Sequence, residues 1–475
     1  MKNVRPTATL NENATSDDKK WGRFEANTTS FPQNVPVFLS PLPTLLFILH
    51  RTPFFSLPMS TAILGGGAAG CLLALRLKTL LPHEPVVIFE RSGTPLAKVR
   101  STGGGRCNVT NTFAHIDDVA AVYPRGARLM SRLLRATPPE ALMQWWESIG
   151  VPLRVEAEGR VFPASQQSDT VVNALLTHLQ RAGVELRTGC DVQGVERQAD
   201  GTFLLTDRHG DALSATPFAQ VAVTCGGLSR PEAFAPWRAM GHEIAAPCPS
   251  LFGLRLEAPA LAALSGVTVG EVTLALSGTK VRAEGPLLIT RQGVSGPGVL
   301  RLSAYGARLL ADAGHRGTLL IGWCGTSDTA SALSELHTLF AAHGGRAVGS
   351  VRAFDLPSRL WALLLERAEV PADRRCAELN RKQLNRLATV LTADAYAITG
   401  RTTHQGEFVT CGGVSLSSVS PKTMESKLVP GLFFAGEVLD IDGLTGGYNL
   451  TAAWLTGLTA AEGIARRVAQ TAAQP

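Results

Sequence analysis

The stretch TAILGGGAAG, residues 61–70, decides the fold of this 475-residue chain. Its first four residues are an apolar run typical of a short buried strand, and the rest has the glycine spacing G-x-G-x-x-G. Residues 68–81 then carry apolar side chains at helical spacing. The run VVIF at 86–89 predicts a second strand, which ends in Glu90. Strand, glycine loop, helix and strand in this order predict an α/β fold that opens with a Rossmann-like dinucleotide-binding unit.

Each glycine of the loop has a different predicted task. Gly65 makes the tight turn, Gly67 lets backbone approach a pyrophosphate, and Gly70 lets the helix pack on the strand. Ala68 and Ala69 are the first residues of the predicted helix. Their free N–H groups and the positive end of the helix dipole favour binding of a phosphate there. Glu90 is placed to accept hydrogen bonds from ribose hydroxyls, which favours FAD or NAD over NADP. No second G-x-G-x-x-G occurs, so one dinucleotide has a recognisable site.

A second glycine cluster follows at residues 101–111, STGGGRCNVTN. Three consecutive glycines expose backbone N–H groups, and an arginine adds charge and donors. A plain surface loop is the simpler interpretation, but the string is very unusual. The candidate cofactor contacts here are Gly104, Gly105, Arg106, Cys107 and Asn108.

A third candidate segment lies near the C-terminus. Residues 431–435 predict a buried strand that runs into Gly436 and Glu437, and a helix is expected over 449–468. In two-halved FAD folds a carboxylate in this place binds the ribitol, and the helix N-terminus faces the flavin N1/O2 edge. Asp440 and Asp442 lack the other ligands of a calcium loop. The remaining candidate contacts are Gly446, Gly447, Tyr448, Asn449 and Leu450.

Taken in order, these strings resemble one family, the bacterial YhiN/BaiN-like flavoproteins, which are NAD(P)/FAD-dependent oxidoreductases. The resemblance covers roughly residues 59–468 and includes three further strings: Gly226–Ser229, Gly293–Pro297 and Gly412–Val414. It implies bound FAD in a discontinuous Rossmann-like domain, with an inserted small β-barrel and helical subdomain. It also implies cofactor contacts at Arg91, Lys98 and Val192.

The sequence departs from the family pattern in two places. Only residues 230–240 separate Ser229 from the Gly241-His242 pair, where the family carries a longer loop, and Cys225 stands where a threonine is usual. We therefore interpret the chain as a divergent branch.

The pattern of short segments predicts the domain organisation. Residues 59–245 are expected to form the first part of the FAD-binding domain. Short apolar runs split by Gly and Pro indicate strands in the segment 246–326, where the resemblance implies the inserted β-barrel. Helical periods over 328–342, 357–368 and 378–392 predict a helical subdomain at 327–393. Residues 394–472 would hold a return strand at 395–399 and the second part of the FAD domain.

Residues 1–58 differ from the rest. Residues 1–35 are polar without periodicity, and 36–58 are interrupted by five prolines, so an over-extended start or a disordered leader is the favoured interpretation. A targeting segment or membrane tether is the alternative, but the longest apolar run, 45–49, is far short of a bilayer span. A cytoplasmic protein without membrane contact is expected.

Composition excludes several classes. With 45% hydrophobic and 18% charged residues the chain is globular, and a net charge of +6 permits an anionic ligand or RNA without requiring either. The eight cysteines form no C-x-x-C pair or Cys/His ligand spacing, so reduced thiols are expected, with neither a disulfide framework nor a metal site.

Candidates for chemistry are few. Cys107 could be a redox thiol, although a packing role is the more ordinary one, and His404 precedes the Gly412 segment that could approach the flavin. Tyr448 is the best candidate to contact the ring. Two basic runs suggest either a solvated face or RNA contact. They are Arg125, Arg128, Arg132 and Arg135, and Arg374, Arg375, Arg381, Lys382 and Arg386.

The sequence therefore predicts an FAD-dependent oxidoreductase in which NAD(P)H, as a transient donor, supplies hydride through the flavin to an unsaturated small molecule. Three alternatives stay open: a flavin-dependent RNA-modifying enzyme that reduces uridine, an oxidase using O₂, and a non-enzymatic FAD-binding scaffold.

Overall fold

The computed structural model describes residues 60–402 and 409–473. The expectations for the leader at 1–58 and for His404 lie outside the described residues.

A parallel five-stranded sheet forms the centre of the nucleotide-binding fold, in the order β18-β9-β1-β2-β6. Its register is continuous, with Thr61 paired to Val86 on one side and to Gln220 on the other. The strands are β1 (Thr61–Leu64), β2 (Val86–Glu90), β6 (Glu185–Thr188), β9 (Gln220–Val223) and β18 (Leu432–Phe434).

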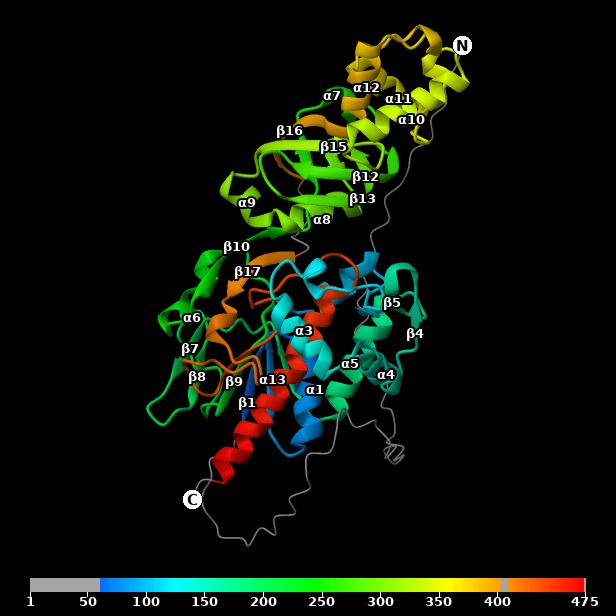
Figure 1. The fold of residues 1–475 in the computed structure, drawn as a ribbon. Coiled ribbons are helices and arrows are strands. Elements are labelled where there is room, and N and C mark those ends of the chain that lie inside the picture. The colour runs from blue at the N-terminus through cyan, green and yellow to red at the C-terminus, as the bar shows by residue number, and fades with distance from the viewer. Residues whose placement is uncertain (1–59, 403–408, 474–475) are drawn as a thin grey trace, which may run out of the picture. The chain divides into compact units, whose positions relative to one another are not determined.

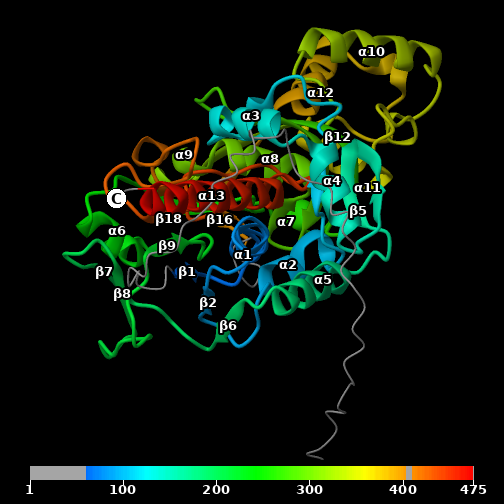
Figure 2. The same ribbon diagram turned by 90° about the horizontal axis from the view of Figure 1, so that it is seen from below.

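Two helices from opposite ends of the sequence pack against each other beside this sheet. They are α1 (Ala68–Leu80) and α13 (Tyr448–Ala472), which lie side by side in Figures 1 and 2. Eight of the 13 residues of α1 are buried, because the sheet, α13 and α5 (Ser168–Arg181) cover the helix. The predicted α/β fold with a Rossmann-like core is therefore confirmed.

Smaller elements complete this part of the chain. An antiparallel sheet has the order β3-β5-β4, and β7 pairs with β8. These strands are β3 (Thr110–Asn111), β4 (Leu153–Val155), β5 (Arg160–Pro163), β7 (Gly194–Arg197) and β8 (Phe203–Thr206). The helices are α2 (Ala97–Ser101), α3 (Ala127–Ala136), α4 (Pro139–Ser148) and α6 (Ala235–Ala239).

Six strands close a barrel in the order β11-β14-β13-β12-β15-β16, which confirms the small barrel that the family resemblance implies. Alternating residues point inward, so Leu274, Leu287 and Ile321 fill the interior. The strands are β11 (Leu254–Leu256), β12 (Thr268–Leu276), β13 (Arg282–Thr290), β14 (Gly293–Ser295), β15 (Gly317–Gly322) and β16 (Asp394–Arg401). Short helices α7 (Pro259–Ala262), α8 (Pro297–Tyr305) and α9 (Ala307–Asp312) are interleaved.

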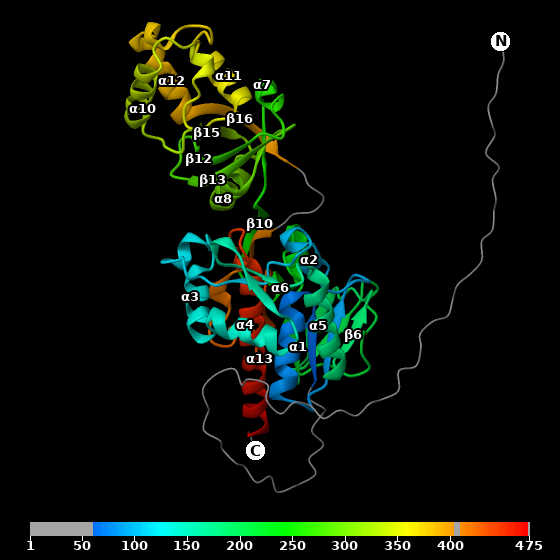
Figure 3. The same cartoon turned by 90° about the vertical axis from the view of Figure 1, so that its right-hand side faces the viewer.

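A helical group follows β15 and packs with the barrel strands (Figure 3). It comprises α10 (Thr329–Ala342), α11 (Ser358–Arg367) and α12 (Arg381–Ala393). Trp361 of α11 and Leu387 of α12 belong to the same hydrophobic core as the barrel, separate from the core around α1. The three helices match the three helical periods of the sequence.

The strand expected at 395–399 is present as β16, but it closes the barrel against β15 and β11 instead of leaving it. The chain leaves the nucleotide-binding fold through β10 (Ile244–Ser250) and returns through β17 (Val409–Val414), which pair antiparallel. Within the described ranges, no helix is long and apolar enough to span a bilayer.

Candidate functional site

The loop after β1 is shaped differently at each glycine. At Gly65 a Cβ would lie 2.5 Å from the Thr224 carbonyl oxygen, and at Gly70 it would collide with the Gly65 carbonyl. At Gly67 it would meet nothing within 4 Å. Gly65 and Gly70 are therefore glycines because protein atoms press on them, whereas the position of Gly67 borders open space.

That open space lies at the start of α1, where no side chain within residues 60–402 and 409–473 caps the helix. The first N–H groups of the helix are thus available, and they carry the positive end of its dipole. An anion such as a pyrophosphate fits this cradle, and a Cβ on Gly67 would fill it.

Glu90 closes the loop from the end of β2. Its carboxylate accepts hydrogen bonds from the N–H groups of Gly66 and Ser92, each at 2.8 Å. The carbonyl of Gly66 in turn accepts from Leu96 N, which ties the loop to the start of α2. Arg91 is exposed just beyond Glu90.

Glu437 is the second carboxylate of the site, and it comes from the other end of the sequence. It accepts hydrogen bonds from Lys98 Nζ at 3.0 Å and from the backbone N–H of Thr410 at 2.9 Å. Gly227 lies so close that a Cβ there would be 2.7 Å from the carboxylate. Neighbouring Gly436 has a φ of +80°, and a Cβ there would press on Ala69 of α1. The structure thus brings Lys98 and Glu437 together across 339 residues.

The second glycine cluster has an exposed part and a buried part. Gly104 and Gly105 have positive φ and border open space. Arg106 lies over the Phe162 ring at 4.1 Å and pairs with Glu156, so its charge is already partly engaged.

Asn108 is buried and links the second cluster to α13. Its amide oxygen accepts from Gly447 N at 2.9 Å, while its amide nitrogen donates to backbone carbonyls of Thr110 and Val161. Asn449 clamps the preceding loop by bonding both the N–H and the carbonyl of Gly443, at 2.8 Å each. These side chains hold the loop that ends at Gly446 and Gly447, and neither amide is free for a ligand.

Two other candidates are placed at the margin of the cofactor region. Val192 is half-buried in the segment after β6, and the neighbouring Cys190 N–H donates to the Glu90 carbonyl at 2.9 Å. Leu450 is half-buried in the first turn of α13.

Cys107 is fully buried, and burial raises the pKa of its thiol to about 12. A thiol with this pKa stays protonated near neutral pH, and only the thiolate is a good nucleophile. The geometry therefore favours the packing role for Cys107 over the redox role.

Tyr448 lines a cavity of about 260 Å³ beside the Thr445–Gly446 loop. Its ring meets Phe113 and Tyr123 edge-on, with centroids 5.3 and 5.9 Å away. Burial raises the pKa of its phenol to about 12, so the group carries a proton at neutral pH.

Sequence reasoning missed most of the other residues around this cavity. Asn111 bridges two loops, donating from its side-chain amide to the Gly446 and Glu158 carbonyls at 3.0 Å each. Arg301 and Tyr305 reach the cavity from α8, more than 140 residues before Tyr448. No local pattern signals these residues, because the topology alone assembles them. The other lining residues are His115, Ile116, Ala121, Arg160 and Leu444.

The first basic run is divided by the structure. Arg125 is not a surface residue: it forms an ion pair with the fully buried Asp442 and donates to the Ala304 carbonyl at 2.7 Å. Arg128, Arg132 and Arg135 are exposed on α3. In the second run Arg374 bonds Gln383 at 3.2 Å, and α12 carries Arg381, Lys382 and Arg386.

Comparison with known families identifies the chain. The model described as "HI0933-like protein Rossmann domain" matches residues 59–463. The chain belongs to the HI0933-like family. The resemblance to YhiN/BaiN-like flavoproteins is thereby confirmed, and the protein is a flavin-dependent oxidoreductase.

Curated relatives span nearly the whole of this family fold. The chain is 27% identical to a 3-dehydro-bile acid delta(4,6)-reductase of Clostridium scindens, over 85% of this chain and 98% of the relative. It is 28% identical to a ribosomal RNA dihydrouridine synthase of Escherichia coli, over 84% and 96%. Among solved structures, a 3-ketosteroid delta1-dehydrogenase of Sterolibacterium denitrificans matches with a TM-score of 0.45 and 12% identity, over 86% of this chain and 99% of that one.

Proposed function

We propose that the protein is an FAD-dependent reductase that takes hydride from NAD(P)H and delivers it to a carbon–carbon double bond. The observation that carries the proposal is the open cradle at Gly67, with Glu90 on one side and the Lys98–Glu437 pair on the other. Bound FAD would supply the hydride transfer, since no described side chain is itself a hydride carrier.

The residues divide the binding task by the chemistry of each part of the cofactor. The N–H groups at the start of α1 would meet the pyrophosphate, and the Glu90 carboxylate would meet the adenosine ribose. Glu437 would accept from the ribitol hydroxyls, and Lys98 would hold this carboxylate in place.

Reduction of a double bond also needs a proton, and Tyr448 is our candidate to provide it. Its phenol lines the cavity, makes no hydrogen bond of its own among the described residues, and stays protonated at neutral pH. Tyr305 lines the same cavity, but its hydroxyl already donates to the Ala121 carbonyl at 2.6 Å. Arg301 would place an anionic or carbonyl-bearing part of the substrate from the α8 side.

The test starts with the cofactor and the donor. Purified protein should release FAD, identified by mass, and anaerobic mixing with NADH or NADPH should bleach the flavin. FMN, or no flavin at all, would contradict the cofactor assignment. Bleaching by neither nucleotide would contradict the proposed donor, and fast reoxidation by O₂ alone would favour an oxidase.

The proton donor is tested by Tyr448→Phe, with Tyr305→Phe as the matched control. A 3-oxo-Δ4 steroid and a uridine-containing RNA serve as probes, because the relatives named above act on such groups by name. In the Tyr448→Phe variant the nucleotide should bleach the flavin at the normal rate. The variant should reduce the probe at least 100-fold more slowly, because it has lost a general acid. An equal loss in Tyr305→Phe would contradict a specific role for Tyr448.

Reduction of an RNA uridine ring is the second candidate function. It is favoured by an observation away from the cavity, the cluster of basic side chains on α12. The two relatives named as ribosomal RNA dihydrouridine synthases, from Escherichia coli and Haemophilus influenzae, support the same candidate. Flavin reduction would be common to both candidates, so only the acceptor distinguishes them.

A further inference from the structure

A wide groove lies on the helical group, apart from the Thr445–Gly446 loop and the cavity lined by Tyr448. Its volume is about 630 Å³, and four of its seven lining residues are cationic: Arg367, Arg381, Lys382 and Arg386. The others are Asn385, Thr389 and Val390, so none of the lining residues that the structure describes is acidic. We propose that this groove binds the phosphodiester backbone of RNA, which rests on the second candidate function.

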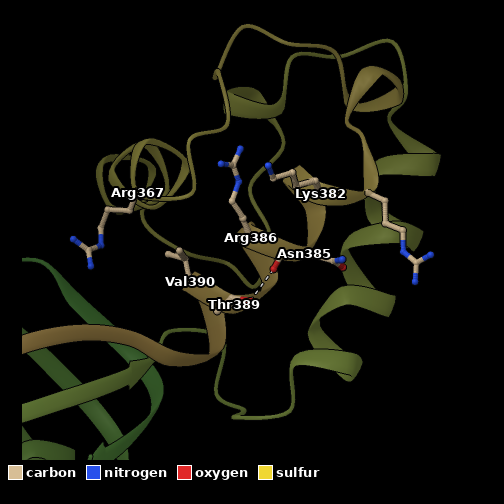
Figure 4. Close-up of a pocket in the computed structure, with 7 residues that line it drawn as sticks. Arg367, Lys382, Asn385, Arg386, Thr389 and Val390 are labelled. Carbon is tan, nitrogen blue, oxygen red and sulfur yellow. Dashed lines mark hydrogen bonds between the residues drawn. The ribbon is translucent and has the colours of Figure 1, made fainter.

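Two cations of α12, Lys382 and Arg386, are placed on one side of the helix. Lys382 and Arg386 are four residues apart and extend their charged ends in the same direction (Figure 4). Two like charges at this spacing repel each other and destabilise an isolated helix. A bound polyanion would offset this repulsion by attracting both cations.

Two of the four cations are neutralised and two are not. Arg367 pairs with the buried carboxylate of Asp394 at 2.5 Å, and Arg386 pairs with the exposed Glu369. Arg381 and Lys382 make no ion pair with any described residue, and both are exposed. The groove therefore keeps a net positive charge that α12 itself concentrates at its first turn.

Arg381 and Lys382 lie in the first turn of α12, where the positive end of the helix dipole adds to their charge. The first turn of α12 contains no acidic residue, although acidic residues are favoured there. Asn380 caps the helix through its side chain and Gln383, so the helix end needs no ligand for its own stability. The two cations are thus not required by the fold of this helix.

The size and composition of the groove point to an extended polyanion. From Arg381 to Val390 the helix rises about 13 Å, so a single small anion would touch only part of the lining. Asn385 and Thr389 add neutral hydrogen-bonding groups between the cations. Arg, Lys, Asn and Thr side chains are the usual partners of phosphate and sugar oxygens. With Val390 as its one aliphatic residue, the groove offers little for the side chains of an acidic peptide.

The test uses the full FAD-loaded chain and a fluorescein-labelled 20-nucleotide single-stranded RNA. Binding is measured by anisotropy from 50 to 300 mM salt without any nicotinamide. The key variant is the double substitution R381Q/K382Q, which leaves both ion pairs of the groove intact. The matched control is R154Q/R181Q, which removes the same charge at two exposed arginines elsewhere.

Each phosphate contact contributes about −0.7 to the slope of log K against log salt for single strands. Loss of two contacts should make the slope shallower by about 1.4 and weaken binding about 25-fold at 0.1 M salt. The control should bind within twofold of the unaltered protein. Thermal unfolding and the flavin spectrum of both variants should be unchanged.

Three results would overturn the proposal. The first is salt-independent or absent RNA binding by the unaltered protein, and the second is an equal loss in the variant and the control. The third is competition by poly-glutamate as effective as that by unlabelled RNA of equal charge, which would assign the groove to an acidic protein partner. Bleaching of the flavin by nicotinamide, measured separately on the same variants, reports on the reductase proposal and is expected to stay normal.

Discussion

At Gly67 and Gly70 the same motif allows binding and folding to be tested separately. Gly67→Val should leave the apoprotein about as stable as before, because its side chain enters open space, but it should abolish flavin retention. Gly70→Ala should destabilise the fold itself, since the new Cβ would collide with the Gly65 carbonyl. Flavin content after purification and urea unfolding of the apoproteins are the two measurements. Normal flavin retention in Gly67→Val would show that the space at Gly67 is not a ligand cradle.

Glu84, at the turn before β2, predicts a pH dependence of stability. Burial is the main cause that raises the pKa of its carboxyl to about 7, although Thr61 Oγ1 donates to it at 3.1 Å. Because the pKa is higher in the folded state, the folded protein is favoured most below the unfolded pKa of 4.5. This contribution of Glu84 to the free energy of unfolding is lost as the pH rises through 7.

Glu84→Gln keeps the acceptor for Thr61 but has no charge to desolvate. At pH 8 the free energy of unfolding of the variant, measured by urea titration, should therefore exceed that of the unaltered protein by about 2–3 kcal/mol. At pH 5 the difference should be much smaller. A difference that is the same at both pH values would contradict the burial of an ionisable carboxyl at this position.

At the scale of elements, the contact between α1 and α13 determines whether the cradle keeps its shape. A Cβ on Gly457 of α13 would lie 2.6 Å from the Ala69 carbonyl oxygen, in the first turn of α1. Gly457→Val should thus cost about 1–3 kcal/mol of stability and also weaken flavin retention. Thr459→Val, two residues further along the same helix and half-exposed, is the control and should do neither. Normal flavin content in a destabilised Gly457→Val protein would show that α13 does not position the loop.

The elements themselves were largely predictable, because each depends on a local pattern. The run TAIL, the glycine spacing and the run VVIF gave β1, α1 and β2, and the apolar runs of the insert gave β12, β13 and β15. For strand β16 the local pattern predicts the strand but not its pairing partners. Its residues alternate like those of any strand, and only the closure of the barrel decides that it pairs with β15 and β11.

The site was predictable only in part, for the same reason. Glu90 is the last residue of β2 and Glu437 follows β18, so their position at the edge of the sheet can be inferred. The pairing of Lys98 with Glu437, and the meeting of Tyr448 with Arg301, depend on contacts between distant segments. Arg125 is the clearest example: it looks like part of a basic helical face, but it neutralises the buried Asp442.

For the whole molecule, the point at which the fold begins can be tested by truncation. Strand β1 starts at Thr61, and the carbonyl of Ser60 accepts from Ala219 N at 3.0 Å, so both residues belong to the fold. A chain that begins at Met59 should bind FAD stoichiometrically and unfold at the same urea concentration as the full chain. A colourless or aggregated product would assign residues 1–58 a part in the structure.

The discontinuous path of the chain has a consequence for synthesis on the ribosome. Strand β18 pairs with β9, yet it emerges about 210 residues later, and α13 comes later still. At about 5–20 residues per second, β9 waits roughly 10–40 s for its neighbour, with one edge unpaired and α1 uncovered. The barrel and its helices have a hydrophobic core of their own and are complete at β16, so they can fold during this delay. The insert is then finished before the nucleotide-binding fold that it interrupts, and the Gly446–Gly447 loop and the first turn of α13, which the proposed flavin site needs, are synthesised only after it.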